Sequence, residues 1–202
     1  MNAASPTVRY RMLALATATF IVCFAAWTLV GALAPLYRQA LQLSATQVGW
    51  LVAMPVLVGS LARLPVGMLA DRFGAHRVLS LLVAALIVPA LMAGGARSYA
   101  SLLAWGALLG LAGAAFAPGV QFVSRWFPPE RHGAALGVFG LGNLGAALSA
   151  ALAPAVSAAW GMRAVFVLFA VVLGLTALMF FGLGRPPAGP RAAPDAGMLR
   201  AL

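Results

Sequence analysis

Six long hydrophobic runs, separated by short polar connections, constrain the fold of this chain more than any other feature. They cover residues 12–36, 48–70, 78–95, 102–123, 134–158 and 165–183. A helix needs about 20 apolar residues to cross the roughly 30 Å hydrocarbon core of a bilayer, and each run is close to or above that length. Because the connections are short, neighbouring helices must be antiparallel. The sequence therefore predicts an all-α membrane protein with six transmembrane helices.

Composition supports this prediction and excludes a soluble domain. Hydrophobic residues make up 63% of the 202 residues and charged residues only 8%, whereas soluble domains carry about 25% charged residues. The formal net charge of +10 could suggest nucleic acid, but the arginines fall mostly between the hydrophobic runs and form no basic face. We therefore interpret them as determinants of topology, and expect a lipid bilayer and no nucleic acid among the partners.

The distribution of arginine predicts the orientation of the chain. One side of the predicted bundle collects Arg9, Arg11, Arg72, Arg77, Arg125, Arg131, Arg185, Arg191 and Arg200. The other side collects only Arg38, Arg97 and Arg163. Because cytoplasmic loops are enriched in Lys and Arg, we predict that both termini are cytoplasmic. Residues 1–11 would form a cytoplasmic N-terminus, residues 12–184 a multi-pass bundle in the cell (inner, cytoplasmic) membrane, and residues 185–202 a cytoplasmic tail or the start of a central loop.

The chain offers few groups for catalysis or metal binding. Its three acidic residues, Asp71, Glu130 and Asp195, lie at membrane edges or in the tail, and its two histidines lie in separate loops. The single cysteine, Cys23, falls in the middle of the first run and is expected to be a small packing residue. No paired carboxylates, metal-ligand spacing or phosphate-binding loop occurs. We therefore expect no enzymatic activity, no metal site and no cofactor.

Arg63 is the one ionisable residue within the second run, residues 48–70. An arginine near the bilayer centre costs about 2.5–3.5 kcal/mol on insertion scales, and it usually faces a water-filled cavity or a counter-charge. A snorkelling or structurally paired arginine is the alternative, but the membrane edge at Asp71 is about 12 Å away along the helix. The planar guanidinium suits a planar oxyanion. We predict that Arg63 binds an anion.

The connection between the second and third runs has a distinctive spacing. Residues 67–77 read GMLADRFGAHR, which fits G-x-x-x-D-R-x-G-x-x-R. This spacing resembles the signature loop of the major facilitator superfamily, so the chain would be the N-terminal six-helix bundle of that fold. The resemblance implies alternating-access transport between two bundles. It also implies that Asp71 helps to lock the outward-facing state, with Arg72 and Arg77 as supporting charges.

Two glycines of this loop have expected local roles. Gly74 can adopt positive φ in a tight turn, and Gly67 would allow a neighbouring helix to approach. The alternative is a membrane hairpin with an ordinary basic turn, for which the arginines would indicate topology alone.

Glycines cluster around one amide, Asn143, in the stretch 110–145, which reads GLAGAAFAPGVQFVSRWFPPERHGAALGVFGLGNLG. Because glycine weakens a helix, this many glycines require an explanation. Tight helix packing is one explanation, with Asn143 bonding to a neighbouring helix. The other is that the glycines bring two backbones close around a small substrate, to which Asn143 donates. The residues alone leave both explanations open.

The same stretch carries a second resemblance. The pattern G-x-x-G-A-x-F-A, followed by W-F-P-P-E-R-x-G-x-A-L-G-x-x-G-x-G-N-x-G, resembles the nitrate/nitrite porter family of that superfamily, as does Arg-x-Pro at residues 63–65. The resemblance implies that Arg63 binds the oxygens of nitrate or nitrite and that Phe116 flanks the flat ion. That side of the site would be completed by Gly140, Gly142 and Asn143.

The family has twelve helices and this chain has six, which leaves three hypotheses. In the first, the chain is the N-terminal half of a nitrate/nitrite transporter, truncated or completed by a separate half. In the second, it works as a homodimer of parallel copies. In the third, it is a non-transporting membrane subunit or remnant. Another organic anion is the alternative substrate, since Arg63 would bind a carboxylate too. No carboxylate lies within the runs to carry a proton, which favours nitrate–nitrite exchange over proton symport.

Overall fold

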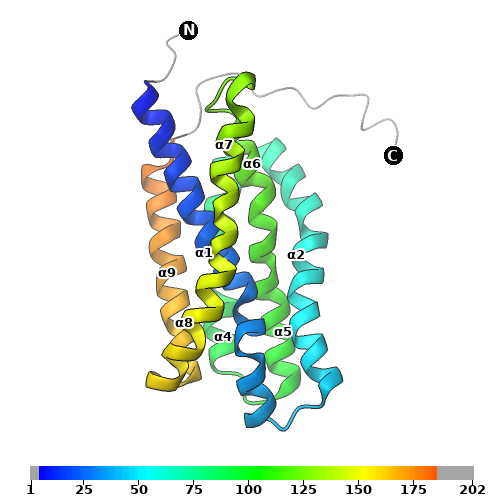
Figure 1. Cartoon of the computed structure of the whole chain (residues 1–202). Coiled ribbons are helices and arrows are strands. Elements are labelled where there is room, and N and C mark those ends of the chain that lie inside the picture. Colours follow the sequence, from blue (N-terminus) through cyan, green and yellow to red (C-terminus); the bar gives the residue numbers. More distant parts are fainter. Residues whose placement is uncertain (1–4, 186–202) are drawn as a thin grey trace, which may run out of the picture.

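The computed structural model describes residues 5–185, and over that range every regular element is a helix. Six helical spans are long and apolar enough to cross a membrane: Pro6–Ala40, Ala45–Phe73, Ala75–Gly94, Tyr99–Ser124, Pro129–Trp160 and Met162–Leu183. Successive spans run in opposite directions, so the connections alternate between the two ends of one bundle (Figure 1). The prediction of six transmembrane helices is confirmed. Of the predicted tail, residues 185–202, all but Arg185 lies outside the described residues.

Three spans are uninterrupted helices and three are interrupted along their length. The uninterrupted ones are α1 (Pro6–Ala40), α2 (Ala45–Phe73) and α9 (Met162–Leu183). The third span consists of α3 (Ala75–Ala85) and α4 (Ile87–Gly94). The fourth consists of α5 (Tyr99–Leu109), the 3₁₀ segment η1 (Gly110–Ala115) and α6 (Phe116–Ser124). The fifth consists of η2 (Pro129–Arg131), α7 (His132–Gly140), η3 (Leu141–Asn143) and α8 (Leu144–Trp160).

Local sequence signals set several helix ends. Ser44 and Gln47 form a reciprocal capping pair at the start of α2: the Gln47 N–H donates to Ser44 Oγ at 3.2 Å, and the Ser44 N–H donates to Gln47 Oε1 at 2.9 Å. Such a pair satisfies amides that the first helical turn leaves without partners. Gly74 has φ +96°, so the expectation of positive φ in the turn between α2 and α3 is confirmed.

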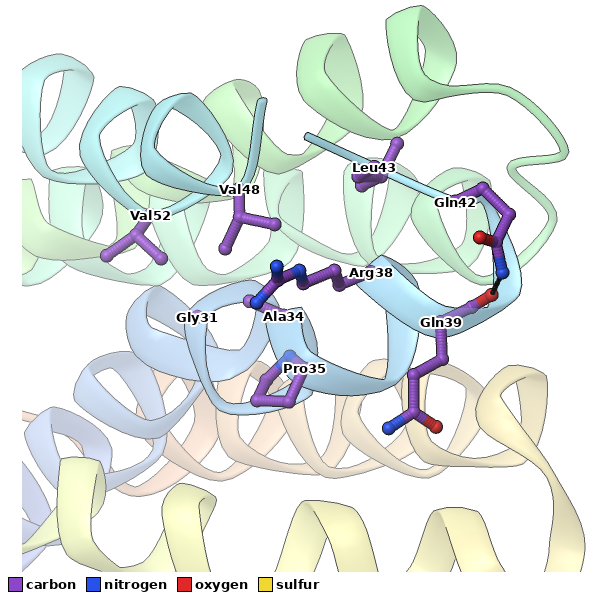
Figure 2. Close-up of a pocket in the computed structure, with 9 residues that line it drawn as sticks. All are labelled: Gly31, Ala34, Pro35, Arg38, Gln39, Gln42, Leu43, Val48 and Val52. Atoms are coloured by element: carbon purple, nitrogen blue, oxygen red, sulfur yellow. Dashed lines mark hydrogen bonds between the residues drawn. The ribbon is translucent and has the colours of Figure 1, made fainter. Parts of the chain in front are cut away.

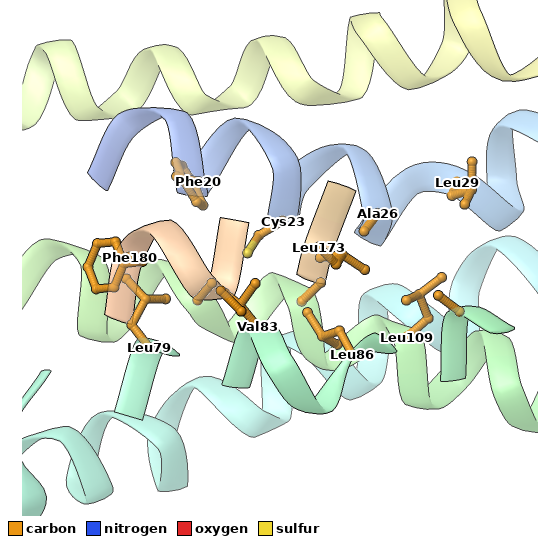
Figure 3. Packing of buried hydrophobic residues seen from close by; sticks show 14 of the residues in the cluster. Phe20, Cys23, Ala26, Leu29, Leu79, Val83, Leu86, Leu109, Leu173 and Phe180 are labelled. Atoms are coloured by element: carbon orange, nitrogen blue, oxygen red, sulfur yellow. The ribbon is translucent and has the colours of Figure 1, made fainter. Parts of the chain in front are cut away.

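A hydrophobic core runs along the middle of the bundle, and α1 is its central helix (Figure 3). Helix α1 packs against α2, α8, α9 and the 3₁₀ segments of two other spans. Its residues Phe20, Cys23, Ala26 and Leu29 meet Leu79, Val83, Leu86, Leu109, Leu173 and Phe180 from the surrounding helices. Cys23 is fully buried there, in agreement with its expected role as a packing residue.

Helix α2 crosses η1 at near-backbone distance. A Cβ atom at Gly110 would lie 2.7 Å from the Cα of Pro55, and one at Gly59 would lie 2.6 Å from the carbonyl oxygen of Gly110. Real Cβ atoms do not approach backbone atoms this closely, so the crossing requires glycine on both helices. It fixes the register of α2 against the fourth span one turn before Arg63.

The arginines at the loops are segregated between the two ends of the bundle. Arg38, Arg97 and Arg163 belong to connections at one end, whereas Arg72, Arg77, Arg125 and Arg131 belong to connections at the other. This is the segregation on which the expected orientation depends. Which end faces the cytoplasm stays a prediction.

Candidate functional site

Arg63 lies in the interior of α2, and its side chain is half-buried. Its Nε–H donates to the carbonyl oxygen of Gly113 in η1 at 3.2 Å. Both terminal nitrogens of a guanidinium carry further N–H donors, and within residues 5–185 none of these bonds to a protein atom. The Gly113 carbonyl therefore anchors the base of the guanidinium while its planar fork stays available to a ligand.

Two aromatic rings flank the guanidinium. The Arg63 Cζ lies 5.5 Å from the centroid of the Trp27 ring and 5.8 Å from that of Phe116. Trp27 is held in turn, because its Nε1–H donates to the carbonyl oxygen of Pro55 at 2.9 Å. Cation–π contacts of this kind contribute about 0.5–2 kcal/mol each. They stabilise a cation at membrane depth without neutralising it, so the charge remains available to an anion.

Phe116 connects Arg63 to an aromatic cluster on the neighbouring helices. It begins α6 and is 40% exposed, so part of its ring faces open space. Its centroid lies 5.7 Å from that of Phe20 and 6.1 Å from that of Phe139. The structure thus brings Arg63 and Phe116 together, and their roles in binding an anion stay predictions. Trp27 was missed, because a tryptophan within a hydrophobic run carries no sequence signal for this contact.

Asn143 and its neighbouring glycines lie where the fifth span packs against α1. The Asn143 side chain is exposed, and its Nδ2–H donates to the carbonyl oxygen of Gly140 at 3.0 Å. Gly142 is buried against Phe20, where a Cβ atom would collide with the ring. In the described part of the chain no hydrogen bond joins Asn143 to Arg63. The binding roles of Gly140, Gly142 and Asn143 stay predictions.

The glycines of the fifth span divide into two groups. One group faces α1, where a Cβ atom would collide with a ring or with backbone: Gly142 and Gly145. In the other group a Cβ atom would meet nothing within 4 Å: Gly133, Gly137 and Gly140. Tight packing inside the bundle therefore explains the first group. It does not explain the second, which lines an open surface of α7.

The charged residues of the loop between α2 and α3 lie at the end of the bundle. Asp71, Arg72 and Arg77 are all exposed. The Arg72 Cζ lies 5.3 Å from the centroid of the Phe73 ring. No ion pair links Asp71 to another residue of the described range. Its carboxylate is therefore available to a partner outside these six helices.

Gly67 is not required by packing within this bundle. A Cβ atom there would lie 3.6 Å from the Cβ of Ala117, which is an ordinary van der Waals distance. Its carbonyl oxygen accepts a hydrogen bond from Gln121 Nε2 at 3.2 Å, which ties α2 to α6. Helix α6 therefore lies beside Gly67 at an ordinary contact distance, which alanine would also allow, and the functional role of Gly67 stays a prediction.

The two histidines have structural positions at helix ends. His76 Nε2 lies 2.9 Å from the carbonyl oxygen of Phe180 near the end of α9, and its ring stacks on the Phe180 ring with centroids 5.4 Å apart. His132 Nε2 lies 2.8 Å from the carbonyl oxygen of Phe127, just beyond the end of α6. Within residues 5–185 no group of three or more His, Cys, Asp or Glu side chains could hold a metal ion.

Comparison with known proteins decides the family. The family model described as Major Facilitator Superfamily matches residues 15–200. This chain belongs to the major facilitator superfamily. Its fold agrees: the structure superposes with a TM-score of 0.78 on a bacterial homologue of the human lysosomal transporter Spinster, over 95% of this chain and 46% of that one at 22% identity. The structure of the POT family transporter PepTSo gives a TM-score of 0.74, over 95% and 40% of the two chains at 16% identity.

Several relatives in the superfamily are named for nitrate or nitrite. The chain is 38% identical to the probable nitrate/nitrite antiporter NarK1 of Thermus thermophilus, over 96% of this chain and 47% of that protein. It is 41% identical to the probable nitrate/nitrite transporter NarK2 of Mycobacterium tuberculosis, over 83% and 43% of the two chains. These matches confirm the resemblance seen in the motifs. The chain is a multi-pass protein of the cell membrane that spans about half the length of the relatives it matches.

Proposed function

We propose that this chain forms one six-helix half of a transporter that carries nitrate or nitrite across the cell membrane, with no catalytic step. The observation that carries the proposal is the Arg63 guanidinium, which is anchored by the Gly113 carbonyl, flanked by Trp27 and Phe116, and otherwise without a protein partner in the described chain. The names of the relatives support the choice of substrate.

The chemistry of Arg63 suits a small planar oxyanion. Charge-assisted, two-pronged hydrogen bonds from a guanidinium give both affinity and a defined plane for the bound ion. In a site from which water is largely excluded, such contacts are far stronger than in bulk solvent. Phe116 is partly exposed beside the guanidinium, so its ring would cover one face of a bound ion. A carboxylate would satisfy the same fork, and it remains the competing substrate class.

A second bundle is expected to cover the face that carries Arg63. The neighbouring residues Leu61 and Leu64 are 68% and 73% exposed. Lipid would suit these leucines, but it would leave the free donors of Arg63 without partners, at a cost of several kcal/mol. The open glycine surface of α7 offers a second place where another backbone would approach closely. We infer that six further helices complete the site, supplied by another polypeptide segment or by a second copy of this chain.

Alternating access would then proceed by rocking of the two bundles around the anion. Asp71 is exposed and without an ion pair in this half, so its carboxylate would contact the second bundle in one state of the cycle. Arg72 and Arg77 would lie on the same cytoplasmic side. No acidic residue occurs within the six hydrophobic runs, so exchange of nitrate for nitrite is the favoured mode of coupling.

The test is uptake of labelled nitrate into liposomes that contain the purified chain. It is measured for the chain alone and for the chain reconstituted with the C-terminal half of one of the nitrate/nitrite relatives. Uptake by the chain alone that is lost in Arg63→Ala indicates a functional homodimer, whereas uptake only in the mixture indicates a half-transporter. A folded sample that transports in neither case refutes the proposal. Competition by acetate but not by nitrite would replace the substrate with an organic anion.

A further inference from the structure

A cavity of about 700 Å³ lies between the C-terminal part of α1 and the N-terminal part of α2, away from Arg63 (Figure 2). Its lining combines apolar residues, among them Pro35, Val48 and Val52, with the polar side chains of Arg38, Gln39 and Gln42. Arg38 is the charged residue of the lining, which contains no carboxylate. The proposed function assigns no role to this cavity.

The Arg38 guanidinium extends into the cavity without a protein partner. Figure 2 shows the side chain running back along α1, with the guanidinium between Ala34 and Val48. No hydrogen bond or ion pair of this guanidinium occurs within residues 5–185. Arg38 is thus an exposed cation of the cavity lining whose donors have no protein partner in the described range.

Capping of α1 does not explain the position of Arg38. The last carbonyl oxygens of the helix accept hydrogen bonds from other groups. The Leu41 N–H donates to the carbonyl of Tyr37 at 2.9 Å, and the Leu43 N–H donates to that of Arg38 at 3.0 Å. Gln42 Nε2 donates to the carbonyl of Gln39 at 2.9 Å. A positive charge at a helix C-terminus contributes about 0.3–1 kcal/mol through the helix dipole, whichever way it points. This general effect gives no reason for the guanidinium to turn into the cavity.

The cavity and Arg63 lie along the same contact between α1 and α2. A Cβ atom at Gly31 would touch Val52 at 4.0 Å. One turn earlier on α1, Trp27 bonds to Pro55 and its ring flanks Arg63. The Trp27–Pro55 hydrogen bond therefore separates the cavity from the Arg63 site. Arg38 comes 11 residues after Trp27 in the sequence, which corresponds to about 16 Å along a helix.

We propose that the Arg38 cavity is an outer binding site for a small oxyanion, which holds the ion before it reaches Arg63. The passage to Arg63 rests on the proposed function; the binding at Arg38 does not. Arg38 is the one charge of the lining and meets no carboxylate there, and clefts lined by charge of one sign raise the local anion concentration and association rates. Arg38 is exposed and has no flanking ring, so the outer site binds more weakly than Arg63.

The experiment is a nitrate titration of the purified full chain in phospholipid-free detergent, followed by broadening of the nitrate nitrogen NMR signal at constant ionic strength set with gluconate. Wild type is expected to show a tighter and a weaker component. Arg38→Gln should remove the weaker one. Arg97→Gln removes the same charge from a loop at the same end of the bundle, outside the cavity, and should remove neither. If the Arg38→Gln variant still shows both binding components in the titration, the proposal is overturned.

Arg63→Ala separates this proposal from the proposed function. Loss of the tighter component with retention of the weaker one supports both sites. If Arg63→Ala changes nothing while Arg38→Gln still removes a component, the Arg38 site stands and the role of Arg63 fails.

A lipid phosphate shares the chemistry of a free oxyanion, so the titration is repeated in phosphatidylcholine nanodiscs. Persistence of the component that depends on Arg38 supports the proposal. Its loss in nanodiscs shows that Arg38 pairs with lipid headgroups and overturns it. In an actively transporting sample, Arg38→Gln is expected to raise the KM for nitrate by up to about tenfold at low salt, with kcat retained.

Discussion

Helices α1 and α2 are both long and apolar, yet the bundle uses them differently. Half of the most hydrophobic stretch of α1 is buried inside the bundle, against 17% of the corresponding stretch of α2. In Figure 1, α1 passes through the middle of the bundle and α2 lies at its edge. Helix α2 buries only Leu51, Pro55, Gly59 and Ala70.

Hydrophobicity therefore does not decide which helix lies at the centre of a membrane bundle. Lipid is as apolar as a leucine side chain, so association depends on close packing of small residues and on hydrogen bonds. Helix α1 meets glycines of both the fourth and the fifth spans, at Gly113 and at Gly145. Helix α2 docks mainly through Pro55 and Gly59, which leaves the face with Arg63 outside the core. One helix therefore organises the bundle, and the other presents the ligand site.

Arg63→Lys should have the largest effect, and it should fall mainly on transport. The lysine keeps the positive charge but loses the planar fork, so nitrate uptake in the active assembly should drop to the background of empty liposomes. The free energy of unfolding in detergent should fall by only about 0.5–1.5 kcal/mol, because the hydrogen bond from Arg63 Nε–H to Gly113 is lost. Near-normal uptake by this variant would remove Arg63 from the binding site.

Gly110→Ala should act mainly on stability, because Gly110 lies where η1 packs against α2. The new Cβ would meet the backbone at Pro55, which cannot move away as a flexible side chain would. We expect a loss of about 1–3 kcal/mol in the free energy of unfolding, measured by SDS titration. Gly137→Ala is the matched control: its Cβ meets nothing within 4 Å, so stability should change by less than about 0.5 kcal/mol. Equal effects of the two substitutions would contradict the assigned crossing.

Asp71→Asn should reduce transport while leaving the six-helix bundle intact. Asp71 makes no ion pair within residues 5–185, so its carboxylate has no partner to lose in this half. Hydrogen bonds to charged groups contribute about 1.5–3 kcal/mol, so loss of one with a second bundle should slow uptake by about tenfold or more. A lower unfolding midpoint with unchanged uptake would show that Asp71 is a structural residue of this half.

Trp27→Phe should give the smallest change and affect both properties. Trp27 belongs to the core helix but flanks the ligand site, and phenylalanine removes its hydrogen bond to Pro55 and the part of the indole ring that packs on Gly59 and Gly113. The lost hydrogen bond alone should lower the free energy of unfolding by about 0.5–1.5 kcal/mol. Phenylalanine retains a weaker cation–π contact with Arg63, so nitrate affinity should fall modestly. An effect on affinity as large as that of Arg63→Lys would make Trp27 a direct ligand contact.

The number and order of the spans could be predicted because each membrane helix satisfies its own backbone hydrogen bonds, so run length alone is informative. Helix α1 nevertheless begins at Pro6, earlier than the apolar run that starts at residue 12, because a helix can continue beyond the hydrocarbon. The 3₁₀ segments could not be predicted. The segment η1 lies where Gly110 meets Pro55, and this contact joins residues from different spans.

The candidate site was predictable to the extent that single residues carry a signal. Arg63 stands out as a charge in an apolar run, and Phe116 came from a family motif. Trp27 could not be assigned, because its contact depends on the register between α1 and α2. The sequence also could not separate Gly142, which packs on Phe20, from Gly137, which faces open space. Their different roles follow from which face of the fifth span meets α1.

The most direct test of the central claim is chemical protection of Arg63 by nitrate. The purified chain is treated with phenylglyoxal at constant ionic strength, and the modification rate of each arginine is measured by mass spectrometry. Binding at Arg63 predicts that nitrate slows its modification in a saturable way while the rate at exposed Arg97 is unchanged. Equal rates at Arg63 with and without nitrate, in a folded sample, would contradict the claim that this residue binds the anion.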